Sequence, residues 1–240
     1  MMPSISFPSS CAEISRMRSG ILSLLCSLDS GFAETPVRSI KLSTLDAMLS
    51  AYDTTFFQGT LRRAYGTLSV TLSSRLISSA GKFVYARSRD KRMIKAEIRM
   101  SSDFLTRLSC GPYSLNGLTV RTPQEAFLIV FEHELCHALE TALYGETGHS
   151  ARFLSLANRF FGHTLTTHSL PTRKAQAAQC GICVGALCSF YYKERLFSGR
   201  ITYVGKTVTV MVQSSTGEYR DRCGRRYTKY RVPPEQILLR

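Results

Sequence analysis

The sequence predicts an α+β fold in which a small antiparallel sheet precedes a long central helix, with a small β-rich module at the C-terminus. Residues 122–145 carry boundary signals for a helix at both ends and a helical period of apolar positions between them. Three short runs between residues 68 and 100 have the composition of strands. After residue 181, closely spaced short strands are separated by glycines.

Composition limits the class of protein. The 240 residues are enough for one sizeable core with an appended module, and 44% hydrophobic and 20% charged residues are ordinary for a folded globular chain. No apolar run approaches the length that spans a bilayer, so we expect no membrane partner. The net charge of +14 favours an anionic partner such as nucleic acid. Eight cysteines without a convincing secretory signal indicate a reducing compartment, the nucleus or the cytoplasm.

The N-terminal residues 1–36 form a poorly defined segment to which we assign no domain. Its Ser- and Arg-rich stretch resembles a mitochondrial transit peptide, although Glu13, Asp29 and Glu34 weaken that interpretation. Mitochondrial targeting therefore stays an alternative to the nucleus or cytoplasm. Residues 41–57 then predict the first helix, because their apolar positions recur at helical spacing.

Strands are expected next, at residues 68–72, 82–86 and 94–100. In the last of these, apolar residues alternate with Lys95, Glu97 and Arg99, which is typical of a strand with one buried face. These strands predict a small antiparallel sheet ahead of the central helix. Residues 110–121, which contain Gly-Pro and Asn-Gly pairs, are expected to form a loop.

The central helix has both ends marked in the sequence. Thr122 is the expected N-cap, Pro123 falls at the first helical position, and Glu125 completes a T-x-x-E capping box. Gly145 supplies the stop. The apolar positions at helical spacing between these ends are Phe127, Val130, Phe131, Leu135, Ala138, Leu139 and Ala142.

His133, Glu134 and His137 form an H-E-x-x-H motif in the middle of this helix. Two histidines four positions apart project from one face of a helix, so both imidazoles can reach a single metal ion. Zinc lowers the pKa of a bound water molecule, and Glu134 can take the proton of that water and pass it to a leaving group. We therefore expect Glu134 to be catalytic and both histidines to bind Zn²⁺.

A tetrahedral zinc that also binds water needs a third protein ligand. His149 lies in a turn-rich stretch after Gly145 that can bring its imidazole back over the helix, and we expect it to be that ligand. His163 and His168 lie beyond a second predicted helix, residues 150–161, and are expected to be surface or core histidines.

A family resemblance follows from these motifs. The stretches FEHELCHA at 131–138 and GHSARF at 148–153 resemble the metallopeptidase core of the SprT-like, Spartan-type family, and the similarity covers about residues 40–163. The resemblance implies a zincin-like core in which Glu134 is the general base and His133, His137 and His149 hold one zinc. One departure is Ser150, where many members have Gly, which should alter the local turn.

The C-terminal residues 181–240, after a linker at 169–180, predict a small SH3-like barrel. Strands are expected at 200–203, 207–212, 219–221 and 227–232. The alternative is a second zinc site like the ribbon of some SprT-like proteins, built on Cys180 and Cys183. Such a ribbon needs two C-x-x-C knuckles and only one is present, so we favour the barrel. Whether Cys180 and Cys183 bind a metal stays open.

Basic and aromatic residues alternate near the end of this module, a mixture suited to phosphates and base stacking. The expected nucleic-acid contacts are Arg220, Arg222, Arg225, Arg226 and Lys229. The alternative is a barrel that contacts protein and whose basic face is solvated.

Together these observations predict a zinc-dependent endopeptidase whose catalytic domain is residues 37–168. We expect a protein substrate to add as a strand along Ile98, Arg99 and Met100, at the edge of the sheet. By family resemblance, the substrate is protein bound or crosslinked to DNA, which makes DNA a candidate partner. The alternative function is a non-catalytic, zinc-containing adaptor whose barrel binds protein or nucleic acid; hydrolysis of a non-peptide bond is a third. The sequence predicts no oligomeric state.

Overall fold

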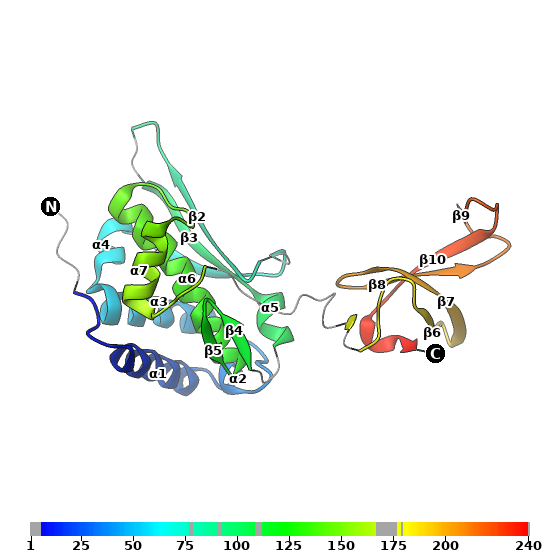
Figure 1. The fold of residues 1–240 in the computed structure, drawn as a ribbon, viewed down its shortest axis with the longest axis horizontal. Helices are drawn as coiled ribbons and strands as arrows, with labels where there is room; N and C mark the ends of the chain where they lie inside the picture. Colours follow the sequence, from blue (N-terminus) through cyan, green and yellow to red (C-terminus); the bar gives the residue numbers. More distant parts are fainter. Residues whose placement is uncertain are drawn as a thin grey trace. The chain divides into compact units, whose positions relative to one another are not determined.

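The computed structural model describes residues 6–76, 79–90, 93–108, 112–166, 177–178 and 180–239. The chain divides into two compact units, Met1–Ser169 and Leu170–Arg240 (Figure 1). As predicted, the fold is mixed α+β, with helices and small sheets in the first unit and an antiparallel sheet in the second. Most of the predicted linker lies outside the described residues, so domain limits at 168 and 181 stay a prediction.

The first unit contains the elements that the sequence predicts at 41–57, 68–72, 82–86, 94–100, 122–145 and 150–161, together with others that it does not. Its helices are α1 (Cys11–Leu28), α2 (Ser30–Ala33), α3 (Leu42–Phe57), α4 (Thr60–Tyr65), α5 (Ser102–Arg107), α6 (Pro123–Tyr144) and α7 (Ala151–Phe161). Its strands are β1 (Leu68–Ser73), β2 (Gly81–Arg87), β3 (Met93–Ser101), β4 (Tyr113–Leu115) and β5 (Leu118–Val120). The expected loop at 110–121 thus contains the hairpin β4–β5, whose turn is Asn116–Gly117.

The larger sheet of this unit is mixed rather than antiparallel. Its order is β1-β3-β2, and β3 pairs in parallel with β1 and antiparallel with β2. The last strand in the sequence therefore occupies the centre of the sheet. The prediction of an antiparallel sheet is wrong for β1, because side-chain alternation reports which face of a strand is buried and not which strand lies beside it.

The helix α6 is the buried centre of the first unit. The capping box is present as predicted: Thr122 Oγ1 accepts from the Glu125 N–H, and the Glu125 carboxylate accepts from the Thr122 N–H, both at 3.2 Å. Gly145, with φ of 85°, ends the helix in the left-handed conformation that glycine adopts without strain. Nearly every residue from Pro123 to Thr141 is buried, as expected for a helix covered on all sides.

Within the described residues 6–36, the N-terminal segment contributes the helices α1 and α2 to the first unit, and the sequence predicted neither. Ser10 caps α1 by accepting from the Glu13 N–H, and Ile14, Ile21 and Leu25 are buried. The remaining face of α1 is rich in serine and exposed. This sparse apolar stripe explains why the sequence resembles a targeting peptide as much as a core helix.

A buried ion pair ties α1 to the motif helix. Arg18 donates to both carboxylate oxygens of Glu132, from Nε at 2.7 Å and Nη2 at 2.8 Å, and Nη2 also donates to the Phe161 carbonyl at 2.9 Å. Tyr52 and His163 hydrogen-bond the same carboxylate at 2.9 Å each. Burial acts to raise the pKa of Glu132, but Arg18 and His163 outweigh it and lower that pKa. His163 is fully buried, which confirms it as a core histidine; His168 lies outside the described residues.

The second unit is a six-stranded antiparallel sheet in the order β11-β6-β7-β8-β10-β9. Its strands are β6 (Leu187–Tyr192), β7 (Arg195–Val204), β8 (Val208–Gln213), β9 (Tyr219–Arg220), β10 (Arg226–Val232) and β11 (Leu238–Leu239), with a 3-10 turn η1 (Pro234–Gln236). The four predicted strands are confirmed, while β6 and β11 were missed. Pairing among the described strands leaves β9 and β11 as the outer strands, so a closed SH3-like barrel stays a prediction.

Side chains from one face of this sheet form a separate core that includes Cys188, Phe190, Ile201 and Val210. Within the part of the chain that the structure describes, no helix is both long and apolar enough to cross a bilayer.

Candidate metal centre

Three histidine side chains converge over α6. The Nε2 atoms of His133 and His137 lie 3.2 Å apart, and the Nε2 of His149 lies 3.0 Å from the first and 3.2 Å from the second. His133 is buried, His137 is half-buried and His149 is exposed, so the cluster opens to solvent on one side. The turn-rich stretch after Gly145 thus returns His149 to the helix, as the sequence indicates.

The spacing of these atoms fits a tetrahedral ion. With Zn–N bonds of about 2.0–2.1 Å, two ligand nitrogens of a tetrahedron are about 3.3 Å apart, close to the observed triangle. Burial and the proximity of His149 lower the pKa of His137 to about 4, against the opposing effect of Glu140. His137 is therefore neutral at physiological pH, which is the form that binds metal.

Hydrogen bonds assign which nitrogen of His137 faces the cluster. Thr147 Oγ1 donates to Glu140 Oε2 at 2.8 Å, so it accepts at 2.7 Å from His137 Nδ1, which carries the proton. The lone pair of His137 is then on Nε2, directed at His133 and His149. A carboxylate acting through a hydroxyl in this way orients a metal ligand and raises its basicity.

Glu140 also holds the segment that carries His149. Its buried carboxylate accepts from the Gly148 N–H at 3.1 Å and from Arg152 Nε at 2.9 Å, in addition to Thr147. Burial acts to raise the pKa of Glu140, and these donors lower it. The residue was not predicted as functional, although its position three residues after His137 places it on the same face of the helix.

Phe153 of α7 packs against all three histidine rings. Its ring is fully buried, and its centroid lies 4.9, 4.4 and 5.3 Å from those of His133, His137 and His149. The sequence did not predict a role for Phe153 in the site. Its contact with all three imidazoles restricts their rotation, which helps to fix the direction of the ligand atoms.

Glu134 follows His133 in α6, and its side chain packs against β2. It is 5% exposed, and burial raises its pKa to about 8 despite an opposing hydrogen bond from the Phe83 backbone. Gly81 makes room for it: a Cβ at that position would lie 2.8 Å from both Cγ and Oε1 of Glu134. Because desolvation causes this shift, a nearby cation would lower the pKa again and favour the carboxylate, the form that can accept a proton.

The same Cβ would lie 3.0 Å from Val130 Cγ1, and none of its three nearest atoms belongs to a histidine. Adding a methyl group at Gly81 should therefore disturb Glu134 most and leave the histidines in place. We expect Gly81→Ala to lower turnover of a protein substrate by about 10- to 100-fold, because a shift near 1 Å of a catalytic group has effects of that size. Zinc content should stay unchanged. The matched control is Gly148→Ala, where an added Cβ meets nothing within 4 Å. Equal turnover in the two variants would contradict this role of Gly81.

The predicted substrate contacts in β3 are not supported by the structure. Ile98 and Met100 have no exposed surface, and Arg99 points to the opposite face, where it pairs with Glu97 at 2.9 Å. The backbone of β3 pairs with β1 on one side and β2 on the other. No edge is left at these residues for a peptide, so strand addition at Ile98, Arg99 and Met100 is excluded.

The residues predicted to contact nucleic acid all lie in the second unit and are exposed. They occupy β9, β10 and the turn between them, and Arg225 pairs with Asp221 at 2.8 Å. Among the described residues, only the three histidines form a group able to hold a metal, so Cys180 and Cys183 belong to no such group here.

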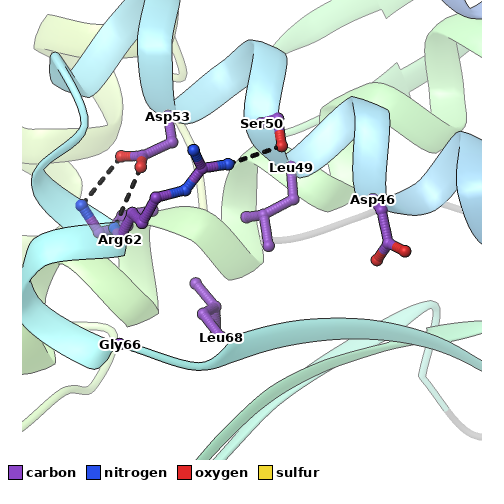
Figure 2. Close-up of a pocket in the computed structure, with 8 residues that line it drawn as sticks. Asp46, Leu49, Ser50, Asp53, Arg62, Gly66 and Leu68 are labelled. Carbon is purple, nitrogen blue, oxygen red and sulfur yellow. Dashed lines mark hydrogen bonds between the residues drawn. The ribbon is translucent and has the colours of Figure 1, made fainter.

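The first unit also has a cavity whose lining includes none of the three histidines. This cavity of about 230 Å³ lies between α3, α4 and the start of β1, and Figure 2 shows Asp53 and Arg62 at one end of it. The Asp53 carboxylate accepts from the backbone N–H groups of Leu61 and Arg62, at 2.9 and 3.0 Å, and Arg62 Nη2 donates to Ser50 Oγ at 3.0 Å. These contacts hold α4 against α3, which gives the polar residues a structural role.

A histidine pair on a buried helix, a third histidine returned by a loop and an adjacent buried carboxyl define a metallopeptidase-like site. A family model described as the SprT-like family matches residues 45–174, which is more than half of the chain. The chain therefore belongs to the SprT-like family, as the sequence motifs indicate. The match ends before the C-terminal sheet. No curated protein and no solved structure matches the chain significantly.

Proposed function

We propose that this protein is a zinc-dependent endopeptidase. The convergence of three Nε2 atoms within 3.2 Å of one another, two of them from the helix that carries the buried Glu134, is the observation that supports it most directly. His133, His137 and His149 would hold one zinc ion. Membership of the SprT-like family supports the same reaction class.

When bound, zinc supplies a Lewis acid that lowers the pKa of water and polarises a carbonyl group. Glu134 would take a proton from the attacking water and deliver it to the leaving amine. Gly81 leaves the space that the Glu134 side chain occupies. Glu140 and Thr147 would keep His137 in the tautomer that presents Nε2.

We place the extended substrate along β2 instead of β3. Among the described strands β2 is an outer strand of its sheet, and the backbone at Gly81 and Phe83 lies next to Glu134. An outer strand has unpaired backbone groups that can hydrogen-bond an extended peptide. Action on proteins bound or crosslinked to DNA is a further part of the proposal, which the family and the basic charge of the chain support.

Loss of the third ligand tests the metal centre. We expect about one zinc per chain in the wild type by elemental analysis, and below about 0.1 in His149→Ala after dialysis, together with loss of protein cleavage. His168→Ala is the matched control and should retain both. Wild-type protein that binds no zinc, or His149→Ala that keeps wild-type cleavage, would overturn the proposal.

A further inference from the structure

The positive charge of the chain is concentrated in the second unit. Residues 170–240 contain 13 Lys and Arg against 4 Asp and Glu, a net charge of +9, whereas residues 1–169 contain 18 against 13, a net charge of +5. The acidic residues Glu194, Glu218, Asp221 and Glu235 all lie between strands, so none of the six strands carries an acidic side chain. The charged side chains within these strands are therefore all basic, and they lie in β7, β9 and β10.

Strand register places part of this charge on one face. In the antiparallel pairing, Lys229 of β10 lies opposite Met211 of β8, which lies opposite Arg200 of β7. Two residues further along β10, Arg231 lies opposite Thr209, and Thr209 lies opposite Tyr203. Paired residues share a face of the sheet, so these two rows lie side by side.

A third row contributes aromatic rings to the same face. Tyr227 of β10 lies opposite Tyr219 of β9, and Lys229 Nζ lies 5.7 Å from the centroid of the Tyr219 ring. The face thus defined, here called the basic–aromatic face, consists of Arg200, Lys229, Arg231, Tyr203, Tyr219 and Tyr227. The valines of β8 and Val232 point to the other side, into the core of the unit.

The side chains of this face are accessible. Tyr203 is 61% and Tyr219 is 44% exposed, and the three cations are exposed. The alternation of tyrosines with cations matches the two chemical features of a single-stranded nucleic acid, its bases and its phosphates. Rings stack on bases while Lys and Arg neutralise phosphates.

We propose that the basic–aromatic face binds single-stranded nucleic acid. Among the described residues, one carboxylate borders the face: Asp221 accepts from the Tyr227 hydroxyl at 3.1 Å. Three cations against this single carboxylate leave the face with a net positive charge, which favours a polyanion over a protein partner. Duplex DNA would use the cations but not the rings. This inference does not depend on the peptidase proposal, because no residue of the face belongs to the histidine cluster.

The face differs from the set of contacts that the sequence indicates. Arg220 and Arg226 are adjacent to Tyr219 and Tyr227 in their strands, so they point to the opposite side. Arg225 is already paired with Asp221. Of the predicted contacts, Lys229 alone lies on the basic–aromatic face.

Fluorescence anisotropy with a labelled oligothymidylate of about 15 nucleotides tests the proposal, using the full chain with Glu134→Gln to prevent cleavage. The triple variant Arg200→Gln/Lys229→Gln/Arg231→Gln should lower the slope of log K against log salt by about 2, because each lost phosphate contact removes about 0.7. Tyr203→Ala and Tyr219→Ala should each weaken binding about tenfold at unchanged slope, as expected for lost stacking.

The matched control removes the same charge from the same unit. Arg220→Gln/Arg222→Gln/Arg225→Gln should weaken binding clearly less than the first triple variant. Equal losses would mean that total charge and not this face is responsible, which overturns the proposal. So would absence of binding by the parent chain at about 50 mM salt, or tyrosine variants that bind as tightly as the parent. Circular dichroism confirms folding, and single Lys229→Gln and Arg231→Gln variants replace any triple variant that does not fold.

Discussion

Glu134→Gln is expected to reduce cleavage of a protein substrate by about a thousandfold, the middle of the range for loss of a general base. Glutamine has the shape of glutamate and fits beside Gly81, but its amide cannot take a proton from water. The three histidines keep their positions, so zinc content should remain at about one per chain. Single-turnover cleavage and elemental analysis on the same preparation measure both quantities.

Glu146→Gln is the matched control for this experiment. Its carboxylate is exposed and pairs with the half-exposed Arg152 at 3.3 Å, so its loss should leave cleavage within about twofold of the wild type. A Glu134→Gln variant that cleaves as fast as the wild type would exclude the general-base role. If neither protein cleaves any substrate while both bind zinc, the non-catalytic adaptor becomes the better interpretation.

Arg18→Ala is expected to lower the free energy of unfolding by about 3–5 kcal/mol, the cost of leaving a buried charge without its partner. The Glu132 carboxylate has no exposed surface, and Arg18 supplies two of its hydrogen bonds. The variant also loses the bond from Arg18 to the Phe161 carbonyl, at the end of α7. Urea denaturation of the metal-free proteins measures the difference.

Two further variants show whether the buried charge is the cause. Arg16→Ala removes an exposed arginine from the same helix and should change stability by less than about 0.5 kcal/mol. Glu132→Gln in the Arg18→Ala background should recover part of the loss, because no unpaired charge then remains. A double variant less stable than Arg18→Ala would show that the ion pair is not the dominant contribution.

The parts of this protein that the sequence predicts well are those determined by neighbours in the chain. The caps of α6, the stop at Gly145 and the common face of His133 and His137 all follow from spacing within one helix, and the structure shows each of them. The return of His149 followed from turn residues a few positions away. Alternation along β3 also gave its buried face correctly at Ala96, Ile98 and Met100, although Ile94 at the start of the strand is 64% exposed.

The parts that were missed depend on residues far apart in the sequence. Arg18 meets Glu132 across 114 positions, and Gly81 meets Glu134 across more than 50. The sequence around Arg18 or Gly81 does not indicate which distant residue each of them contacts. The centre of the sheet was misassigned for the same reason, since the order of strands is decided by the path of the chain between them.

The hydrogen bonds of Glu140 have a consequence for how a metal ion would be acquired. They fix Thr147, Gly148 and Arg152 through protein atoms alone, so the loop bearing His149 is preorganised before any ion arrives. Little conformational entropy is then lost on loading, which favours tight capture at low free-metal concentrations. Unlike a zinc finger, whose apo form is a random chain, this protein should keep its shape through cycles of demetallation and reloading.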